Sequence, residues 1–183
     1  MAKKCIVLLA KGFEETEAVT CIDILRRGGI EVTVAGLNKL EITGSHEITV
    51  FADIRIDQAG EDFDCCLLPG GMPGATNLAG CEKVISLIKK MNSQGKIIAA
   101  ICAAPAVVLA PAEILNKKSA TCYPDMQDSF DNSTSFINKS VVVDGNIITS
   151  QGVGTALLFS LAVLEKLSGK QISEKVKKAT LCP

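Results

Sequence analysis

The chain has 183 residues, of which 48% are hydrophobic, and its 19 basic and 20 acidic side chains leave a formal net charge of −1. This length suits one domain with a sizeable core, so we expect a single domain over residues 1–183. The near-zero charge without a long basic tract argues against nucleic-acid binding, and no apolar run approaches the ~18 residues that span a bilayer. Lys11 interrupts the short apolar segment near the N-terminus, so we interpret that segment as a strand and expect a cytoplasmic protein without a nucleic-acid or membrane partner.

The N-terminal part of the chain predicts a strand, a helix and a second strand. Residues 4–10 (K-C-I-V-L-L-A) form an apolar run typical of a buried strand. Residues 14–27 have helical apolar spacing, acidic residues in the first turn and a Gly-Gly stop after the last. Residues 31–36 (E-V-T-V-A-G) are the second strand, so the three segments form a βαβ unit, which requires parallel strands.

The middle of the chain continues the alternation. Residues 47–53 alternate as a strand near a sheet edge, and residues 64–68 (D-C-C-L-L) form a short buried strand. The turn at 69–74 (P-G-G-M-P-G) lets backbone N–H groups face a ligand, although it matches neither a phosphate-binding P-loop nor the dinucleotide pattern. Residues 81–93 are an amphipathic helix.

The C-terminal half completes an α/β pattern. Because helices and strands alternate throughout, we expect a three-layer α/β sandwich with a mostly parallel sheet. The remaining predicted elements are a strand at 97–101, a helix at 103–109, a polar excursion at 117–138, a hairpin at 141–149, a glycine-containing bend at 151–155, an apolar helix at 156–167 and a short helix at 172–178.

Cys102 lies where a strand passes directly into a helix, within K-I-I-A-A-I-C-A-A-P at residues 96–105. Ligands of open α/β sheets bind beyond the carboxyl ends of the strands, where the next helix presents free N–H groups. A thiol at that position should have a pKa below the ~8.5 of free cysteine. Cys102 is therefore the lead candidate for the reactive atom.

The eight cysteines do not indicate a disulfide or metal framework, because they contain no C-x-x-C and no Cys/His cluster. Most lie inside apolar patterns, where free cysteine behaves as a small hydrophobe. We therefore expect no metal ion and no organic cofactor.

Five segments together resemble the ThiJ/PfpI superfamily, and within it the branch of the Parkinsonism-associated protein deglycase and its bacterial chaperone-like relatives. The resemblance implies a flavodoxin-like fold and a homodimer. The segments are A-K-G-F-E-E-T-E at 10–17, V-T-V-A-G at 32–36, L-P-G-G at 68–71, A-A-I-C-A-A-P at 99–105 and T-S-Q-G-V-G-T at 149–155.

The resemblance also implies roles for individual residues. Cys102 would be a nucleophile on a strained elbow, Glu17 the acid hydrogen-bonded to its sulfur, and the amides of Gly71 and Ala103 the donors to a developing oxyanion. Because two negative charges in one pocket repel, we expect Glu17 to keep its proton beside a thiolate and to donate it. The matched turns add Gly70 and Gly154 to the predicted binding residues.

The chain departs from the superfamily in its histidines. Amidotransferase and protease members place a histidine near the nucleophile, whereas Ala103 follows Cys102 here and His46 is the only histidine. Tyr123 stands where this branch often has a histidine, and a tyrosine with a pKa near ~10 is a poor general base. His46 has two interpretations: an exposed loop histidine, which we favour, or a residue that approaches the pocket of a partner subunit.

Two functions follow from the resemblance. The leading one is a cysteine-dependent glyoxalase or deglycase that acts on methylglyoxal or glycated protein adducts and protects against oxidative and carbonyl stress. The alternative is a redox sensor or chaperone-like protein in which Cys102 is oxidised to sulfinic acid without turnover. A cysteine peptidase or amidotransferase is disfavoured by the missing histidine.

Overall fold

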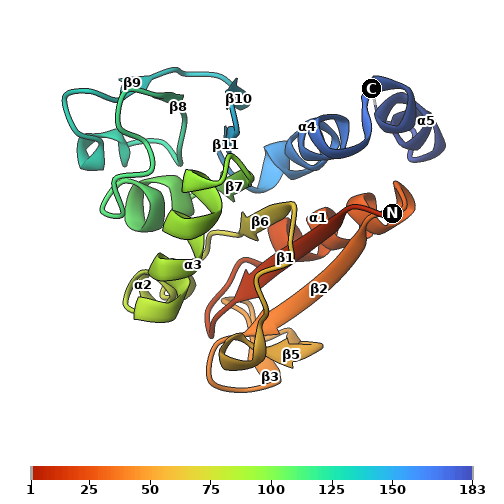
Figure 1. Cartoon of the computed structure of the whole chain (residues 1–183), viewed down its shortest axis with the longest axis horizontal. Coiled ribbons are helices and arrows are strands. Elements are labelled where there is room, and N and C mark those ends of the chain that lie inside the picture. Colours follow the sequence, from red (N-terminus) through yellow and green to blue (C-terminus); the bar gives the residue numbers. More distant parts are fainter. Residues whose placement is uncertain (1, 183) are drawn as a thin grey trace.

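The computed structural model describes residues 2–182 and confirms the mixed α/β architecture (Figure 1). The strands are β1 (Lys4–Leu9), β2 (Glu31–Gly36), β3 (Glu41–Thr43), β4 (Thr49–Phe51), β5 (Ile54–Arg55), β6 (Cys65–Leu68), β7 (Ile97–Ile101), β8 (Ser119–Ala120), β9 (Ser135–Phe136), β10 (Val141–Asp144) and β11 (Ile147–Ser150). The helices are α1 (Glu15–Arg27), α2 (Gly74–Ala79), α3 (Glu82–Ser93), α4 (Ala156–Ser168) and α5 (Lys170–Ala179), with short helical turns η1 (Ile56–Gln58), η2 (Pro105–Leu109), η3 (Gln127–Ser129) and η4 (Val153–Thr155).

Seven strands form the central sheet in the order β10-β11-β7-β6-β1-β2-β5. Every neighbouring pair is parallel except β10 and β11, which form the predicted antiparallel hairpin. The class is therefore the predicted flavodoxin-like one. Because β1, β6 and β7 are neighbours, the three segments that follow them begin at one edge of the sheet.

Successive side chains of β1 point to opposite faces of the sheet, and each face packs against its own apolar cluster. Val7 and Leu9 belong to an apolar cluster with residues of α1 and α4, while Ile6 and Leu8 belong to a second cluster with residues of α2 and α3. All four are almost fully buried. Because both faces of the sheet are apolar, helices cover both of them, and the sheet is the middle of three layers.

Two regions differ from the sequence prediction. The alternating segment around β4 pairs with β3 in a separate two-stranded ribbon, and β5 takes the edge of the central sheet instead. The side chains of the ribbon still differ in burial, since Ile42 is buried in the core and Phe51 is exposed. The alternating sequence pattern therefore belongs to the ribbon and not to the central sheet. The six-residue helix α2 was missed because it is too short for a periodic pattern and begins at a glycine.

The most apolar helix, α4, is thirteen residues long and packs against α1 and α5. Within residues 2–182, no helix is both long and apolar enough to cross a membrane.

Candidate functional site

Cys102 lies on a sharp turn directly after β7. Its backbone has φ of +64°, a left-handed conformation that costs a residue with a Cβ of order 1–3 kcal/mol. The Cys102 amide donates to the Ser150 carbonyl at 2.9 Å, which holds the turn against the end of β11. The backbone therefore has the strained geometry that the sequence predicted for an elbow.

Gly70, after β6, approaches Cys102 so closely that only glycine fits. A Cβ at residue 70 would lie 2.6 Å from the Cys102 Cβ and 3.0 Å from its sulfur. The Gly70 carbonyl accepts from the Glu14 amide at 3.0 Å, so the same residue also joins the start of α1. Three turns from β1, β6 and β7 thus meet at this point.

Glu17 lies in the first turn of α1 and is fully buried. Its Oε2 accepts a hydrogen bond from the Gly70 amide at 2.8 Å, whereas its Oε1 has no regular hydrogen bond within the part of the chain that the structure describes. Burial raises the pKa of Glu17 to about 7, an effect that the Glu14 charge increases and that the Gly70 amide and the Cys102 thiol oppose. A proton on Oε1 would leave the Gly70 hydrogen bond intact.

The pKa of the Cys102 thiol moves in the opposite direction from the sequence prediction. Burial, followed by the charge of Glu17, raises it to about 12, although the amides of Gly71 and Ala103 act to lower it. The sequence showed the strand-to-helix turn but not how far the thiol would be buried. Since the ionised Glu17 contributes to this shift, protonating Glu17 removes one of the causes that hold the thiol neutral.

Several predicted residues surround the thiol. Gly71 and Ala103 direct their amides at the Cys102 sulfur, and Gly70 contacts its Cβ region. Gly154 lies in the exposed turn η4, where an added methyl group would meet no atom within 4 Å, so its binding role stays a prediction.

Tyr123 lies beside the elbow, as its place in the sequence indicated. Its amide donates to the Cys102 carbonyl at 2.8 Å, and about half of the residue is exposed. A Cβ at Gly152 would lie 3.5 Å from the tyrosine ring. Tyr123 therefore borders the site with its phenol ring.

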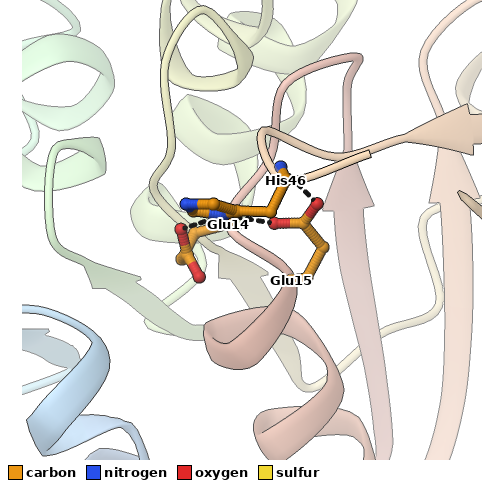
Figure 2. A group of neighbouring side chains, drawn as sticks. All are labelled: Glu14, Glu15 and His46. Carbon is orange, nitrogen blue, oxygen red and sulfur yellow. Dashed lines mark hydrogen bonds and ion pairs between the residues drawn. The ribbon is translucent and has the colours of Figure 1, made fainter. Parts of the chain in front are cut away.

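His46 lies on the loop between β3 and β4 and contacts the acidic start of α1 (Figure 2). Its Nδ1 is 3.0 Å from Glu15 Oε2 and 3.4 Å from Glu14 Oε2, and its side chain is 69% exposed. The hydrogen bond with Glu15 and the two carboxylate charges raise the pKa of His46. His46 is therefore an exposed loop residue, which is compatible with both interpretations, and the sequence did not show that Glu14 and Glu15 would face it.

The pKa of Glu15 is lowered, whereas that of Glu17 is raised, although both residues lie in the same helical turn. Burial alone would raise the pKa of Glu15, but hydrogen bonds from its own backbone, from His46 and from Ile48 lower it to about 2. The loop that carries His46 thus holds Glu15 as a carboxylate.

A cleft of about 920 Å³ opens beside this region, between the ends of β1 and β2 and the helices α2 and α3. Lys11, Asn38, Thr76 and Cys81 are among the residues that line it, whereas Cys102 and Glu17 are not. This cleft is therefore separate from the thiol.

Most of the other cysteines are buried, as their apolar surroundings in the sequence predicted. Within residues 2–182 no two are joined by a disulfide, and five are buried: Cys5, Cys21, Cys65, Cys66 and Cys122. Burial raises the pKa of the Cys21 thiol to about 12 and that of Cys122 to about 11. These thiols fill the core and are not reactive nucleophiles.

Comparison with known proteins gives consistent matches over nearly the whole chain. The model of the DJ-1/PfpI family matches residues 3–166. The protein dj-1beta of Drosophila melanogaster is 43% identical over 99% of this chain and 98% of its own length. The glutathione-independent glyoxalase DJR-1.2 of Caenorhabditis elegans is 31% identical over 96% of this chain and 95% of its own length. DJ-1 homolog B of Arabidopsis thaliana is 42% identical over 96% of this chain, which spans only 40% of that protein.

Solved structures agree with the fold. The crystal structure of Drosophila melanogaster DJ-1beta superimposes with a TM-score of 0.96 at 42% identity, and each chain is covered completely. The structure of oxidized Toxoplasma gondii DJ-1 has a TM-score of 0.95 at 37% identity, with 98% of each chain covered.

The raised pKa of Glu17 predicts a specific dependence of stability on pH. The pKa of Glu17 is 4.5 in the unfolded chain and about 7 in the folded protein. Between these pH values the folded state therefore binds one more proton than the unfolded chain. Stability therefore falls as pH rises from 4.5 to 7, by about 3 kcal/mol for this buried group. We expect Glu17→Gln to abolish this loss, so that the variant gains stability over the wild type between pH 5 and pH 8.

The measurement is urea unfolding of wild type and Glu17→Gln at pH 5, 6, 7 and 8 in metal-free buffer. The difference between the two proteins cancels the titration of His46, which both share. A difference in unfolding free energy that stays constant from pH 5 to pH 8 would contradict the raised pKa.

Proposed function

The chain belongs to the DJ-1/PfpI family, and on this basis we propose that it is a cysteine-dependent glyoxalase that converts methylglyoxal to lactate without glutathione. A relative of nearly equal length in Caenorhabditis elegans is named a glutathione-independent glyoxalase, which supports this choice within the family. The observation that carries the proposal is the contact of the Cys102 thiol with a buried carboxyl group whose pKa lies at about 7.

In the first step, the Cys102 sulfur adds to the aldehyde carbon of methylglyoxal and forms a hemithioacetal. The thiol proton passes to the Glu17 carboxylate as the carbon–sulfur bond forms, and it then returns to the aldehyde oxygen, which has gained the negative charge. The amides of Gly71 and Ala103, which point at the sulfur, are in place to stabilise that oxyanion.

In the second step, Glu17 moves a proton between the two carbons. As a carboxylate it removes the proton from the former aldehyde carbon, and as a carboxylic acid it returns a proton to the former ketone carbon, which yields a thioester of lactate. A carboxyl group with a pKa near 7 can act in both forms at neutral pH. Water then cleaves the thioester, releasing lactate and the thiol, so the overall change is an isomerisation followed by hydrolysis.

The proposal predicts the effect of three variants on lactate formation from methylglyoxal in the absence of glutathione. Cys102→Ser should abolish it, because the hydroxyl group is a far weaker nucleophile. Glu17→Gln should lower the rate by at least about 10²-fold, since general acid–base catalysis contributes that much. Cys81→Ser is the matched control and should keep the wild-type rate. Lactate formation that is unaffected by Cys102→Ser would refute the proposal.

A wider role is part of the same proposal. The thiol chemistry would extend to glycated protein adducts and so give deglycase activity and protection against carbonyl and oxidative stress. Eight cysteines without a disulfide within residues 2–182 favour a reducing compartment, in agreement with the cytoplasmic location that we propose.

A second candidate function is redox sensing or a chaperone-like activity switched by oxidation of Cys102. Two observations favour it: Cys102 is partly accessible beside a carboxyl group, and a solved relative from Toxoplasma gondii is described as oxidized. Peroxide would convert the thiol to sulfenic and then sulfinic acid, each step transferring one oxygen atom from peroxide, which is reduced to water.

The sensor hypothesis predicts that mild peroxide adds two oxygen atoms to Cys102 stoichiometrically, as read by intact mass and peptide mapping. Cys102→Ser should remove this addition while leaving any oxidation of Cys81 unchanged. If lactate formation is negligible and sulfinic acid forms at Cys102, the sensor replaces the glyoxalase. If peroxide leaves Cys102 unmodified, the sensor is excluded.

We also propose that the protein is a homodimer, with the contact formed by the exposed apolar surface between α1 and β4. Val19 and Phe51 are 49% and 75% exposed and line the same hollow of about 140 Å³. Phe51→Asp should convert the dimer to a monomer in light scattering, because it places a charge in the apolar contact. A dimer that persists in this variant would contradict this surface.

In such a dimer the exposed ring of His46 would approach the partner's pocket, and a His46→Ala dimer with full activity and an unchanged pH profile would refute that role.

A further inference from the structure

Glu14, Glu15 and His46 form a compact group of possible metal ligands at the N-terminus of α1 (Figure 2). The two carboxylates come from the end of the turn after β1, and the imidazole comes from the loop between β3 and β4. One ligand atom of each residue lies within 4.8 Å of the others. We call these three residues and the adjacent Ser45 the α1 cluster.

Five distances among the ligand atoms of the α1 cluster are close to the edges of a tetrahedron around a metal ion. His46 Nδ1 is 3.0 Å from Glu15 Oε2 and 3.4 Å from Glu14 Oε2. Ser45 Oγ is 3.1 Å from His46 Nδ1, 3.2 Å from Glu15 Oε2 and 3.3 Å from Glu14 Oε2. Tetrahedral zinc with ligands at 2.0–2.2 Å separates those ligands by about 3.3–3.6 Å. An ion could therefore occupy the centre with small side-chain shifts, and Ser45 Oγ would mark the fourth position.

Backbone hydrogen bonds hold one oxygen of each carboxylate and leave the other directed at the cluster. Glu15 Oε1 accepts from the amides of His46 at 2.6 Å and Ile48 at 3.3 Å, while Glu14 Oε1 accepts from the Thr16 amide at 3.4 Å. The oxygens that converge on His46 Nδ1 are the two Oε2 atoms. Ligands oriented in this way by their other polar atom are a recurring feature of protein metal sites.

The space and charge of the α1 cluster also suit a cation. The side chains of Glu14 and Glu15 are only 11% and 5% exposed, and the exposed imidazole is the basic group that the structure places against both. With a neutral imidazole, two adjacent carboxylates face each other with little solvent to screen them. A Cβ at Gly44 would lie 2.3 Å from Glu15 Oε1, so glycine at this position leaves room for the carboxylate.

We propose that the α1 cluster binds a divalent transition-metal ion, with zinc as the leading candidate, through Glu14 Oε2, Glu15 Oε2 and His46 Nδ1. An imidazole nitrogen together with two carboxylate oxygens favours zinc or its neighbours over calcium and magnesium, which prefer oxygen ligands alone. Ser45 Oγ or a water molecule that it holds completes the tetrahedron. The Glu14 amide donates to the Gly70 carbonyl, so the ion lies beside the turn that supports the Cys102 site without using its thiol.

The test is titration of metal-free protein with Zn²⁺ and Co²⁺ in a Cys81→Ser, Cys102→Ser, Cys182→Ser background, which removes the partly accessible thiols. We expect one Zn²⁺ per chain by calorimetry and a tetrahedral Co²⁺ spectrum without a thiolate charge-transfer band. His46→Ala and Glu15→Gln should each weaken Zn²⁺ binding at least about tenfold. Gly44→Ala should weaken it as well, because the new methyl group displaces the Glu15 carboxylate.

Glu47→Gln is the matched control, since it removes the same charge as Glu15→Gln from the exposed residue next to His46. It should leave the affinity for Zn²⁺ within twofold of the background protein. Absence of Zn²⁺ binding at 100 µM metal, or stoichiometric binding that His46→Ala and Glu15→Gln leave unchanged, would overturn the proposal. None of these readouts depends on lactate formation, so the metal site and the glyoxalase activity are tested separately.

Discussion

The hydrogen bond from the Gly70 amide to Glu17 Oε2 is the contact on which the site depends. It joins the turn after β6 to the first turn of α1, directly above the strained backbone of Cys102. Since a Cβ at Gly70 would collide with Cys102, the thiol, the carboxyl group and the donor amides are fixed within one small volume. That volume tolerates one negative charge more readily than two, and this limit links the protonation of Glu17 to that of Cys102.

The start of α1 shows how position determines the behaviour of three identical side chains. Glu17 faces the core, where burial raises its pKa, while hydrogen bonds from the His46 loop lower the pKa of Glu15 despite its burial. Glu14 caps the helix, accepting from the Thr16 amide, and faces His46. One turn of helix therefore places a buried carboxyl group against the thiol on one side and two carboxylates against the imidazole on the other. The two groups of contacts are adjacent but use different atoms.

Much of the fold could be predicted because its strands are apolar runs with clear limits. The predictions at 31–36 and 97–101 coincide with β2 and β7, and the hairpin of β10 and β11 lies where its turn residues indicated. Cys102 and Glu17 could be selected because segments that resemble those of a known family contain them in the expected order. The predicted direction of the shift in the pKa of the Cys102 thiol was wrong, because the burial of the thiol depends on neighbours from three separate turns. The contact of His46 with Glu15 spans 31 positions, and His46 lies outside every motif, so the sequence contained no signal for the contact.

Burial keeps Glu17 a neutral carboxylic acid beside Cys102 in mildly acidic solution, and Glu17 loses its proton near pH 7. Infrared difference spectroscopy, comparing wild type with Glu17→Gln, observes the C=O stretch of a protonated carboxyl group directly. We expect such a band at pH 6 that disappears at pH 8 and is absent from the variant. A spectrum without a protonated carboxyl band at pH 6, or with the same band in Glu17→Gln, would contradict it.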